Sequence, residues 1–224
     1  MQDLTLVIPA KHESESLPTF LNELSSYNCR KLIVLEKTDL KTINSIKNFE
    51  DVIIVYQKKQ GYGAALLEGI GQVKTDFFCI INADGSMNPK YLIEMIQKIK
   101  NKNLDFLFAS RYEKPGGGSD DDDFVTSIGN FLFTKIGNIF FSLKITDILF
   151  TYVMGKTKSF NNLNLNSFDF TLCIEFPIKA VRKNCSIGTI PSYERARIGG
   201  KKKVNAFKDG LLILIKMIKM FFFR

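Results

Sequence analysis

A regular alternation of short apolar runs with segments of helical spacing is the feature that most constrains how this chain folds. Each apolar run has the length of a buried strand, and the segments between runs show the spacing of helices. Short links join the two, which predicts an α/β fold with a mostly parallel sheet and helices on both of its faces. Strands are expected at residues 4–9, 31–35, 52–56, 77–81 and 104–110, and helices at 16–24, 42–49, 64–73 and 89–100.

The alternation stops after the fifth expected strand. Residues 113–123 hold a glycine-rich stretch and a run of aspartates, which cannot pack as a regular element. We expect a mobile loop there, either a plain solvated connection or a lid or acceptor loop. The expected elements beyond it are an apolar helix at 124–143, a helix interrupted at Pro177 at 169–182, a strand at 186–190 and a last helix at 204–223.

Size and charge limit the class of protein. A chain of 224 residues buries one substantial core, so we expect one α/β domain over 1–210 and an apolar, basic terminal helix over 211–224. The net charge of +8 is concentrated after residue 182, which suits a diphosphate or an anionic membrane face. Nucleic acid is disfavoured because no aromatic residues are interleaved with these charges. The single histidine, His12, excludes a histidine-rich zinc site or a Ser-His-Asp triad anchored elsewhere.

The compartment also follows from composition. The cysteines show no C-x-x-C spacing and are expected to be buried free thiols in a reducing cytoplasm. The N-terminus lacks the positive region of a signal peptide, and no apolar run reaches the roughly 20 residues that span a bilayer. Residues 211–223 combine aromatic residues with lysines, which indicates either an interfacial helix or a core-packing one. We expect a cytoplasmic protein that is peripheral at the inner face of the membrane.

The candidate site lies where strands end, because ligands of such sheets bind beyond the carboxyl ends of the strands. Asp84 follows the fourth expected strand, between Asn82 and Ser86. A carboxylate there is costly unless it is neutralised, and a divalent cation that also binds phosphate oxygens is a natural partner. Asp84 is therefore the predicted metal ligand, and Asn82 can add either a neutral oxygen ligand or a hydrogen bond to a ribose; the alternative is that Asp84 is a turn residue or a helix cap.

Three further segments are candidates for contact with an anionic ligand. Glu13 follows the first strand and either contacts the ligand or complements a helix dipole. Gly61 and Gly63 permit close backbone approach, or simply form a turn into a helix. The basic loop from Arg195 to Lys203 suits a diphosphate, or is a plain solvated loop.

The order of these segments resembles the family-two glycosyltransferases of GT-A fold, in particular the dolichyl- or polyprenyl-phosphate sugar synthases. The resemblance covers nearly the whole chain. The matching segments are Val7-Ile8-Pro9-Ala10-Lys11-His12-Glu13, Gly61-Tyr62-Gly63-Ala64-Ala65, Asn82-Ala83-Asp84-Gly85-Ser86, Ser110-Arg111-Tyr112, Thr146-Asp147 and Arg197-Ile198-Gly199-Gly200-Lys201-Lys202-Lys203.

The resemblance implies roles for the matching residues. Mg²⁺ or Mn²⁺ would be held by Asp84 with Ser86, and Arg111 would stabilise phosphate charge. A hydroxyl acceptor would need a general base, for which Asp147 is the first candidate and Asp169 the second. The residues expected at the nucleotide are Pro9, Ala10, Glu13, Glu36, Gly61, Gly63, Asn82, Ala83, Asp84, Arg197 and Lys203.

The chain also departs from the family pattern. Asn82 replaces the first aspartate of the metal motif, and Glu36 stands where the family has an aspartate that contacts the nucleotide. The aspartates at 120–123 stand where the synthases carry basic residues, and their charge would repel a lipid phosphate.

We predict an inverting glycosyltransferase that moves a sugar from a UDP- or GDP-sugar to a lipid-linked or glycan acceptor in polysaccharide biosynthesis. The alternatives are a nucleotidyltransferase that makes the nucleotide sugar, and a degenerate homologue that binds nucleotide without turnover. The acceptor is either a lipid phosphate or a hydroxyl, and the oligomeric state is left open.

Overall fold

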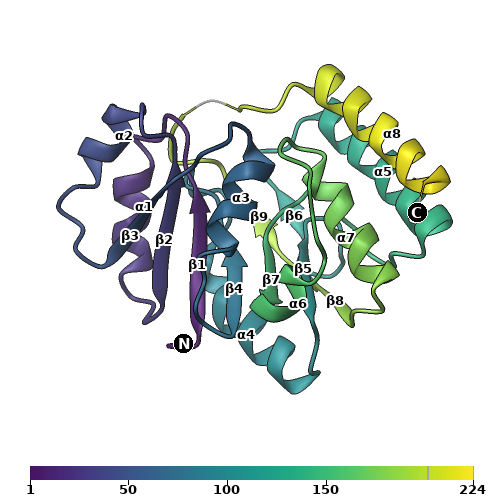
Figure 1. Ribbon diagram of the computed structural model, residues 1–224, viewed down its shortest axis with the longest axis horizontal. Helices are drawn as coiled ribbons and strands as arrows, with labels where there is room; N and C mark the ends of the chain where they lie inside the picture. Colours follow the sequence, from purple (N-terminus) through teal and green to yellow (C-terminus); the bar gives the residue numbers. More distant parts are fainter. Residues whose placement is uncertain (201, 224) are drawn as a thin grey trace.

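A seven-stranded sheet forms the centre of the computed structural model, which describes residues 1–200 and 202–223 (Figure 1). Its strand order is β3-β2-β1-β4-β7-β5-β8, and every neighbouring pair is parallel except the two that involve β7. This confirms the predicted mostly parallel α/β sheet. The strands are β1 (Leu4–Pro9), β2 (Arg30–Leu35), β3 (Val52–Tyr56), β4 (Phe77–Ile80), β5 (Phe106–Ser110), β7 (Val153–Lys156) and β8 (Ile187–Pro191).

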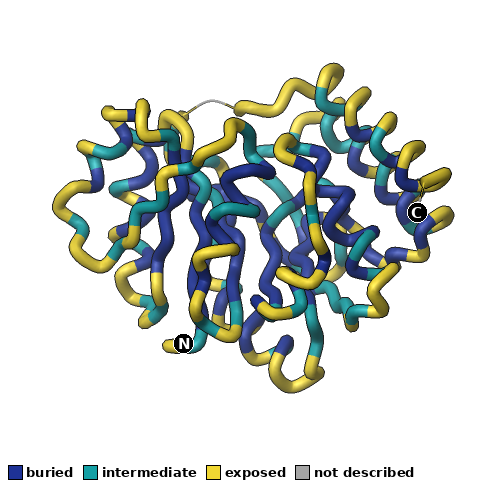
Figure 2. The backbone as a smooth tube through the Cα atoms, viewed as in Figure 1, coloured by how far each residue is buried: buried dark blue, intermediate teal, exposed yellow. Residues whose placement is uncertain are grey.

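The central strands are apolar because helices cover both faces of the sheet (Figure 2). One face packs on α1 (Leu17–Leu24) and α4 (Leu92–Asn101), which follows the short η1 turn (Pro89–Tyr91). The other face packs on α3 (Tyr62–Ile70), α6 (Thr157–Asn161) and α7 (Leu172–Arg182). The remaining helix, α2 (Leu40–Ser45), lies beyond β2.

No pattern in the sequence predicts β7, which lies antiparallel between β4 and β5. Its four residues include a glycine and a lysine, so the apolar pattern of the other strands is absent. Gly155 is required by packing, because a Cβ there would lie 2.6 Å from the Phe106 ring and 2.8 Å from the Phe78 ring. Close contact with these two aromatic side chains explains the position of β7 in the sheet.

The predicted break at Pro177 is wrong, because α7 runs through it without interruption. A proline inside a helix costs about 3 kcal/mol, since it removes one hydrogen bond and crowds the preceding turn. Phe176 and Ile178 on either side of it are buried against the sheet and against α8, respectively. Burial of about 1.5–3 kcal/mol for each large apolar side chain outweighs the cost of the proline.

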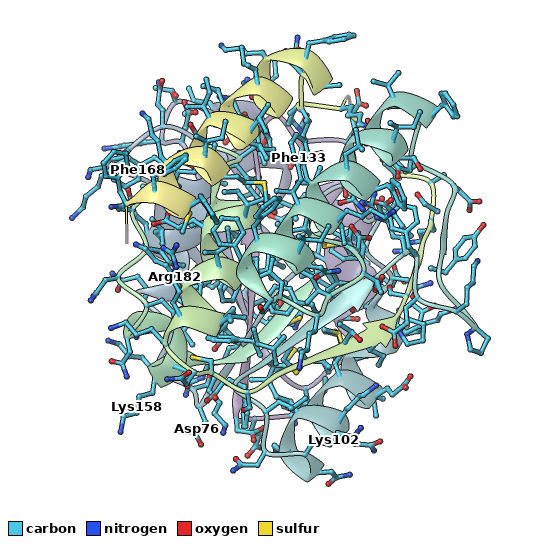
Figure 3. All side chains as sticks on the ribbon, turned by 90° about the vertical axis from the view of Figure 1, so that its right-hand side faces the viewer. Asp76, Lys102, Phe133, Lys158, Phe168 and Arg182 are labelled. Atoms are coloured by element: carbon cyan, nitrogen blue, oxygen red, sulfur yellow. The ribbon has the colours of Figure 1, made fainter. Side chains whose placement is uncertain are left out.

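The helices α5 (Phe124–Phe141) and α8 (Ala206–Phe222) lie side by side against α7 (Figures 1 and 3). Phe133 of α5 lies between the two helices in Figure 3, where it faces Gly210 of α8. The predicted domain boundary after residue 210 falls inside α8. Among the described residues, α5 is long and apolar enough to cross a membrane by length and composition.

The outward faces of α5 and α8 form an apolar face that nothing covers in the described part of the chain. Its exposed members on α5 are Phe124, Val125, Ile128, Phe131, Leu132, Ile139 and Phe140, and on α8 they are Phe207, Leu211, Leu212, Leu214, Ile215, Ile218, Phe221 and Phe222. The buried members Ile213, Met217 and Met220 attach α8 to the body of the protein. The α8 helix therefore packs on the core with one face and exposes apolar residues on the other.

The aspartate loop, residues 113–123, is more ordered than the sequence indicates. It contains a short strand, β6 (Gly118–Ser119), that pairs with β9 (Tyr193–Glu194). The expectation that this segment forms no regular element is therefore wrong. Pairing with a strand about 75 residues later has no local pattern in the sequence, which is why the expectation failed.

Candidate functional site

A cavity of about 530 Å³ opens beyond the carboxyl ends of β1, β2, β4 and β5. Its size is that of a small-molecule site, and its position is the one expected for an α/β sheet. Every predicted nucleotide residue except Gly63 lines it. The predicted lining residues are Pro9, Ala10, Glu13, Glu36, Gly61, Asn82, Ala83, Asp84, Ser86, Arg111, Arg197 and Lys203.

Asp84 lies in a tight turn directly after β4. Its Oδ1 accepts hydrogen bonds from the backbone N–H of Ser86 at 3.1 Å and from the Ser86 hydroxyl at 3.0 Å. Its Oδ2 lies 3.8 Å from Arg197 Nη1. Gly85 has a φ of +76°, and a Cβ there would lie 2.5 Å from Ile198, so glycine is needed for this turn. The turn presents the second carboxylate oxygen to the cavity.

This donor set fits a cation that shares its ligands with a substrate. Among the described residues no group of three His, Cys, Asp or Glu side chains is placed to hold a metal ion. Mg²⁺ and Mn²⁺ are commonly bound by one or two carboxylates together with phosphate oxygens and water. Asp84, with Ser86 beside it, supplies the protein's share of such a site.

Asn82 is held by Tyr62, a residue whose side chain the sequence did not single out. The Tyr62 hydroxyl donates to Asn82 Oδ1 at 3.1 Å and lies 2.5 Å from the Thr151 hydroxyl. Burial raises the pKa of Tyr62 well above its usual range, so the hydroxyl stays protonated. The Tyr62 ring also stacks on Phe170 at a centroid distance of 5.0 Å. The amide of Asn82 is thereby fixed at the wall of the cavity.

The two glycines at the start of α3 serve contacts within the protein. A Cβ on Gly61 would lie 2.1 Å from the Phe168 carbonyl oxygen, and one on Gly63 would lie 2.4 Å from that of Ser167. Gly61 also has a φ of +116°, which favours glycine. Only Gly61 lines the cavity. The predicted nucleotide contact at Gly63 is not seen in this geometry, because the backbone at 167–169 occupies the space beside it.

Arg111 lies at the far end of the cavity among three carboxylates. Asp147 accepts from its backbone N–H at 3.0 Å, its Nε at 2.8 Å and its Nη2 at 3.0 Å. Nη1 donates to Glu194 Oε2 at 3.2 Å and lies 3.5 Å from Asp122 Oδ2. Burial alone would lower the pKa of Arg111, but the attraction of Asp147, Glu194 and Asp122 raises it, so the guanidinium stays charged.

Asp147 does not line the cavity. Its side chain is 0% exposed and both of its oxygens are held by Arg111. A base must reach the proton it removes, so this geometry gives no support to the expectation that Asp147 acts as general base. The geometry fits a positioning residue that orients Arg111. Asp169 is exposed, accepts from Thr171 at the start of α7 and does not line the cavity either.

The aspartate loop reaches the cations predicted to bind phosphate. Asp121 accepts a hydrogen bond from Arg197 Nε at 2.9 Å and a second one from Arg197 Nη2. Asp123 accepts a hydrogen bond from Lys202 Nζ at 2.6 Å. These pairs join residues more than 70 positions apart, and they fix the loop over the cavity.

The remaining basic side chains at the cavity also have acidic partners. Lys203 pairs with Glu13, and Lys11 pairs with Glu36 at 3.0 Å. Lys201, which belongs to the same predicted basic loop, lies outside the described residues. An anionic ligand therefore meets cations that already have carboxylate neighbours, and it must compete with them or bring a cation of its own.

Asp122, Glu194 and Tyr62 are site residues that the sequence reasoning did not identify. Asp122 lay within a run interpreted as a loop, and Glu194 directly precedes the basic loop but is not one of its basic residues. Tyr62 belonged to the glycine segment, but nothing in that segment indicates that its hydroxyl reaches Asn82. Each of the three is placed by contacts with residues distant in the chain.

Comparison with known proteins agrees with this geometry. Residues 5–163 match the family model described as "Glycosyl transferase family 2", which is more than half of the chain. The chain belongs to glycosyl transferase family 2. Among the curated members, uncharacterized glycosyltransferases of Mycobacterium bovis and Mycobacterium tuberculosis are 25% identical over 108 residues, which cover 48% of this chain and 48% of theirs. The chain thus matches about half the length of these relatives.

Solved structures share the fold of this family member. Glucosyl-3-phosphoglycerate synthase from Mycobacterium tuberculosis with Mn²⁺, UDP and glucosyl-3-phosphoglycerate gives a TM-score of 0.75 at 11% identity, covering 97% of this chain and 78% of that one. The same enzyme with Mn²⁺, UDP-glucose and phosphoglyceric acid gives 0.74 at 11% identity, covering 96% and 78%. This likeness confirms the predicted GT-A fold.

Proposed function

We propose that this chain is an inverting glycosyltransferase that uses a UDP- or GDP-sugar and Mg²⁺ or Mn²⁺. The observation that carries the proposal is the cavity, because it gathers Asp84, Arg197 and Lys203 beside a wall of apolar and polar residues from β1 and β2. The fold neighbour with bound Mn²⁺ and UDP supports the same ligand class. Family membership supports transfer of a glycosyl group.

The lining residues indicate where the two parts of the donor, its nucleoside and its diphosphate, would lie in the cavity. Pro9, Ala10 and Glu36 line the end beyond β1 and β2, where a nucleoside would lie. Asp84 and Arg197 lie together, and their opposite charges suit a diphosphate with its cation. When bound, the cation stabilises the negative charge that develops on the departing nucleoside diphosphate. Arg197 adds a fixed positive charge at the same place.

Donor binding also explains why so many charges of both signs line the cavity. Asp121 neutralises Arg197, and Glu13 neutralises Lys203. A diphosphate that arrives with a divalent cation offers oxygens to the basic groups and a positive charge to the carboxylates. Neither set of charges is then left buried without a partner, which would be costly.

The apolar face of α5 and α8 supports a peripheral place at the inner face of the cytoplasmic membrane. Its exposed side chains are flanked by lysines, including Lys208 and Lys219, which suit anionic headgroups. A lipid-linked or glycan acceptor in polysaccharide biosynthesis would then meet the cavity close to the membrane surface. Within residues 1–210 the sheet and its covering helices would supply the catalytic domain, and α5 together with the terminal helix would supply the membrane contact.

A thermal-shift panel tests the donor and the metal together. UDP, GDP, CDP and dTDP sugars are added with and without Mn²⁺; a ligand at 100 times its Kd adds about 2.7 kcal/mol of stability. For a chain of this size that raises Tm by roughly 5–11 °C, at about 2–4 °C per kcal/mol. Asp84→Ala should abolish the Mn²⁺-dependent part of the Tm increase. Asp76 is an exposed carboxylate outside the cavity, so Asp76→Ala should keep the full increase.

Three results would contradict the proposal. A metal-dependent shift that survives Asp84→Ala would refute the metal assignment. Release of pyrophosphate from a nucleoside triphosphate and a sugar phosphate, in place of a nucleoside diphosphate from a nucleotide sugar, would identify the protein as a nucleotidyltransferase. A protein that binds nucleotide but transfers no sugar would be a degenerate homologue.

A further inference from the structure

The end of the cavity around Arg111 has the chemistry of an acceptor site. It lies beyond Asp84 from the nucleoside end, and it is lined by Arg111, Asp121, Asp122 and Glu194. Three of these four side chains are carboxylates, and the fourth, Arg111, is a cation. The neighbouring cation Arg197 is already bound by Asp121 through two hydrogen bonds.

Arg111 has little capacity left to bind an anion. Its Nε and Nη2 donate to Asp147, and its Nη1 is shared between Glu194 and Asp122. A phosphate at this end would find no guanidinium edge free, and it would meet a net negative charge because Asp122, Glu194 and Asp147 share the one cation Arg111. Like charges in a partly buried cavity repel strongly. The acceptor that fits is therefore uncharged at its reacting end.

Asp122 has one oxygen without a hydrogen-bond donor. Its Oδ2 accepts from the Tyr112 hydroxyl and lies 3.5 Å from Arg111 Nη1. Its Oδ1 is buried and receives no hydrogen bond from the described residues, and the side chain as a whole is only 7% exposed. A buried carboxylate oxygen without a donor costs free energy, which a ligand hydroxyl would recover by donating to it.

We infer that this end of the cavity binds an uncharged hydroxyl acceptor and that Asp122 is the general base that takes the hydroxyl proton. This rests on the proposed glycosyl transfer. As the proton passes to Asp122, the hydroxyl oxygen forms a bond to the anomeric carbon. The bond from that carbon to the phosphate oxygen breaks, and its electron pair leaves with the nucleoside diphosphate. The proton on Asp122 then exchanges with water.

The other two carboxylates have different roles. Asp121 is held by Arg197 and cannot turn toward the acceptor without giving up this contact. Glu194 accepts from Arg111 and from the Ser119 hydroxyl at 2.6 Å, so it fixes the loop that carries Asp122. Arg111 is in turn oriented by Asp147. Asp122, which lines the cavity, is the carboxylate of this group that has an oxygen without a hydrogen-bond donor.

The experiment uses UDP-glucose with Mn²⁺ as donor and glycerol as an uncharged acceptor, and it follows release of UDP. Asp122→Asn keeps the shape of the side chain and an oxygen that accepts from Tyr112. We expect it to lower glycerol-dependent release by about 100-fold or more, the usual contribution of a general base. Binding of UDP and Mn²⁺, read as a thermal shift, should be unchanged.

Azide separates loss of a base from loss of structure, because it attacks without giving up a proton. In Asp122→Asn the repelling charge is gone, so azide should restore UDP release and yield β-glucosyl azide. Asp120→Asn is the matched control. Asp120 is exposed, accepts from the Tyr193 hydroxyl at 2.5 Å and does not line the cavity, so its variant should keep the wild-type rate.

Each opposite result overturns the inference. Asp122→Asn with the wild-type rate, no rescue by azide while UDP still binds, or equal loss in Asp120→Asn would show that Asp122 is not the base. Faster transfer to glycerol 3-phosphate than to glycerol in the wild type would exclude an uncharged acceptor. A wild type that releases no nucleoside diphosphate from any UDP- or GDP-sugar with Mn²⁺ would overturn the proposed donor and this inference together, whereas the results above overturn only the assignment of Asp122.

Discussion

Replacing Asp147 by alanine tests whether this residue positions Arg111 or acts as a base. In the structure its carboxylate accepts three hydrogen bonds from Arg111, at 2.8 to 3.0 Å, and its side chain is 0% exposed. Alanine removes all three acceptors and leaves Nε, Nη2 and one backbone N–H without partners. Nη1 keeps its hydrogen bond to Glu194, so the buried charge of Arg111 is still partly neutralised.

The expected loss of stability follows from these contacts. Removing one partner of a buried ion pair costs about 3–5 kcal/mol, because the other charge stays buried. At about 2–4 °C per kcal/mol for a chain of 150–250 residues, Tm should fall by roughly 6–20 °C. Urea denaturation gives the free energy of unfolding, and the slope m shows whether unfolding remains two-state. Asp147→Asn keeps the side-chain volume and one acceptor oxygen, so it should lower the free energy of unfolding less than Asp147→Ala does.

Asp169→Ala is the control, because Asp169 is the other aspartate that the sequence marked as a possible base. It is exposed and accepts from the Thr171 N–H at 2.9 Å, so its removal should cost about 1 kcal/mol, as for a helix cap. A positioning role for Asp147 is refuted if the free energy of unfolding of Asp147→Ala lies within about 1 kcal/mol of the wild-type value and the variant nevertheless loses transfer activity. That combination is the behaviour of a catalytic base.

Three further predictions rest on separate contacts. Gly61→Ala should destabilise the protein by at least about 1–3 kcal/mol in urea denaturation, because its Cβ would meet the Phe168 carbonyl at 2.1 Å, whereas Gly129→Ala, with nothing within 4 Å, should stabilise α5 by about 1 kcal/mol. Burial raises the pKa of Cys173 to about 12, so iodoacetamide at pH 8 should label the two half-buried cysteines, Cys29 and Cys185, before Cys173. Peptide mass measures the order of labelling, and early labelling of Cys173 would contradict its burial. Phe222→Glu should weaken co-sedimentation with phosphatidylglycerol vesicles by at least roughly tenfold, since burial of a phenylalanine contributes about 1.5–3 kcal/mol; equal sedimentation would show that α8 does not contact the membrane.

The outline of the fold was predictable because its signals are local. A strand such as β1 is apolar over its whole length, since both faces of a parallel sheet are covered, and this pattern is visible in the sequence. The strand-end residues were predictable for a related reason. Parallel strands bring their carboxyl ends to one edge, so Glu13, Asn82 and Asp84 had to lie near one another once the strands were recognised.

Elements that depend on distant partners were not predictable. The strand β7 lacks the apolar pattern and is held between β4 and β5 by aromatic packing around Gly155. The proline in α7 indicated a break by local rules, but packing on both sides of Pro177 overrides them. In both cases tertiary contacts outweigh the local preference of the chain.

The sequence by itself determined an α/β sheet, the edge of the sheet at which the cavity opens and a single carboxylate, Asp84, after the strand β4 at that edge. The tertiary structure decided how the remaining charges are paired. Asp121 meets Arg197 across 76 positions and Asp147 meets Arg111 across 36, and ion pairs of this separation leave no periodic trace in a sequence. The pairing turns an aspartate run interpreted as a mobile loop into part of the cavity wall, and it leaves one oxygen of Asp122 without a hydrogen-bond donor.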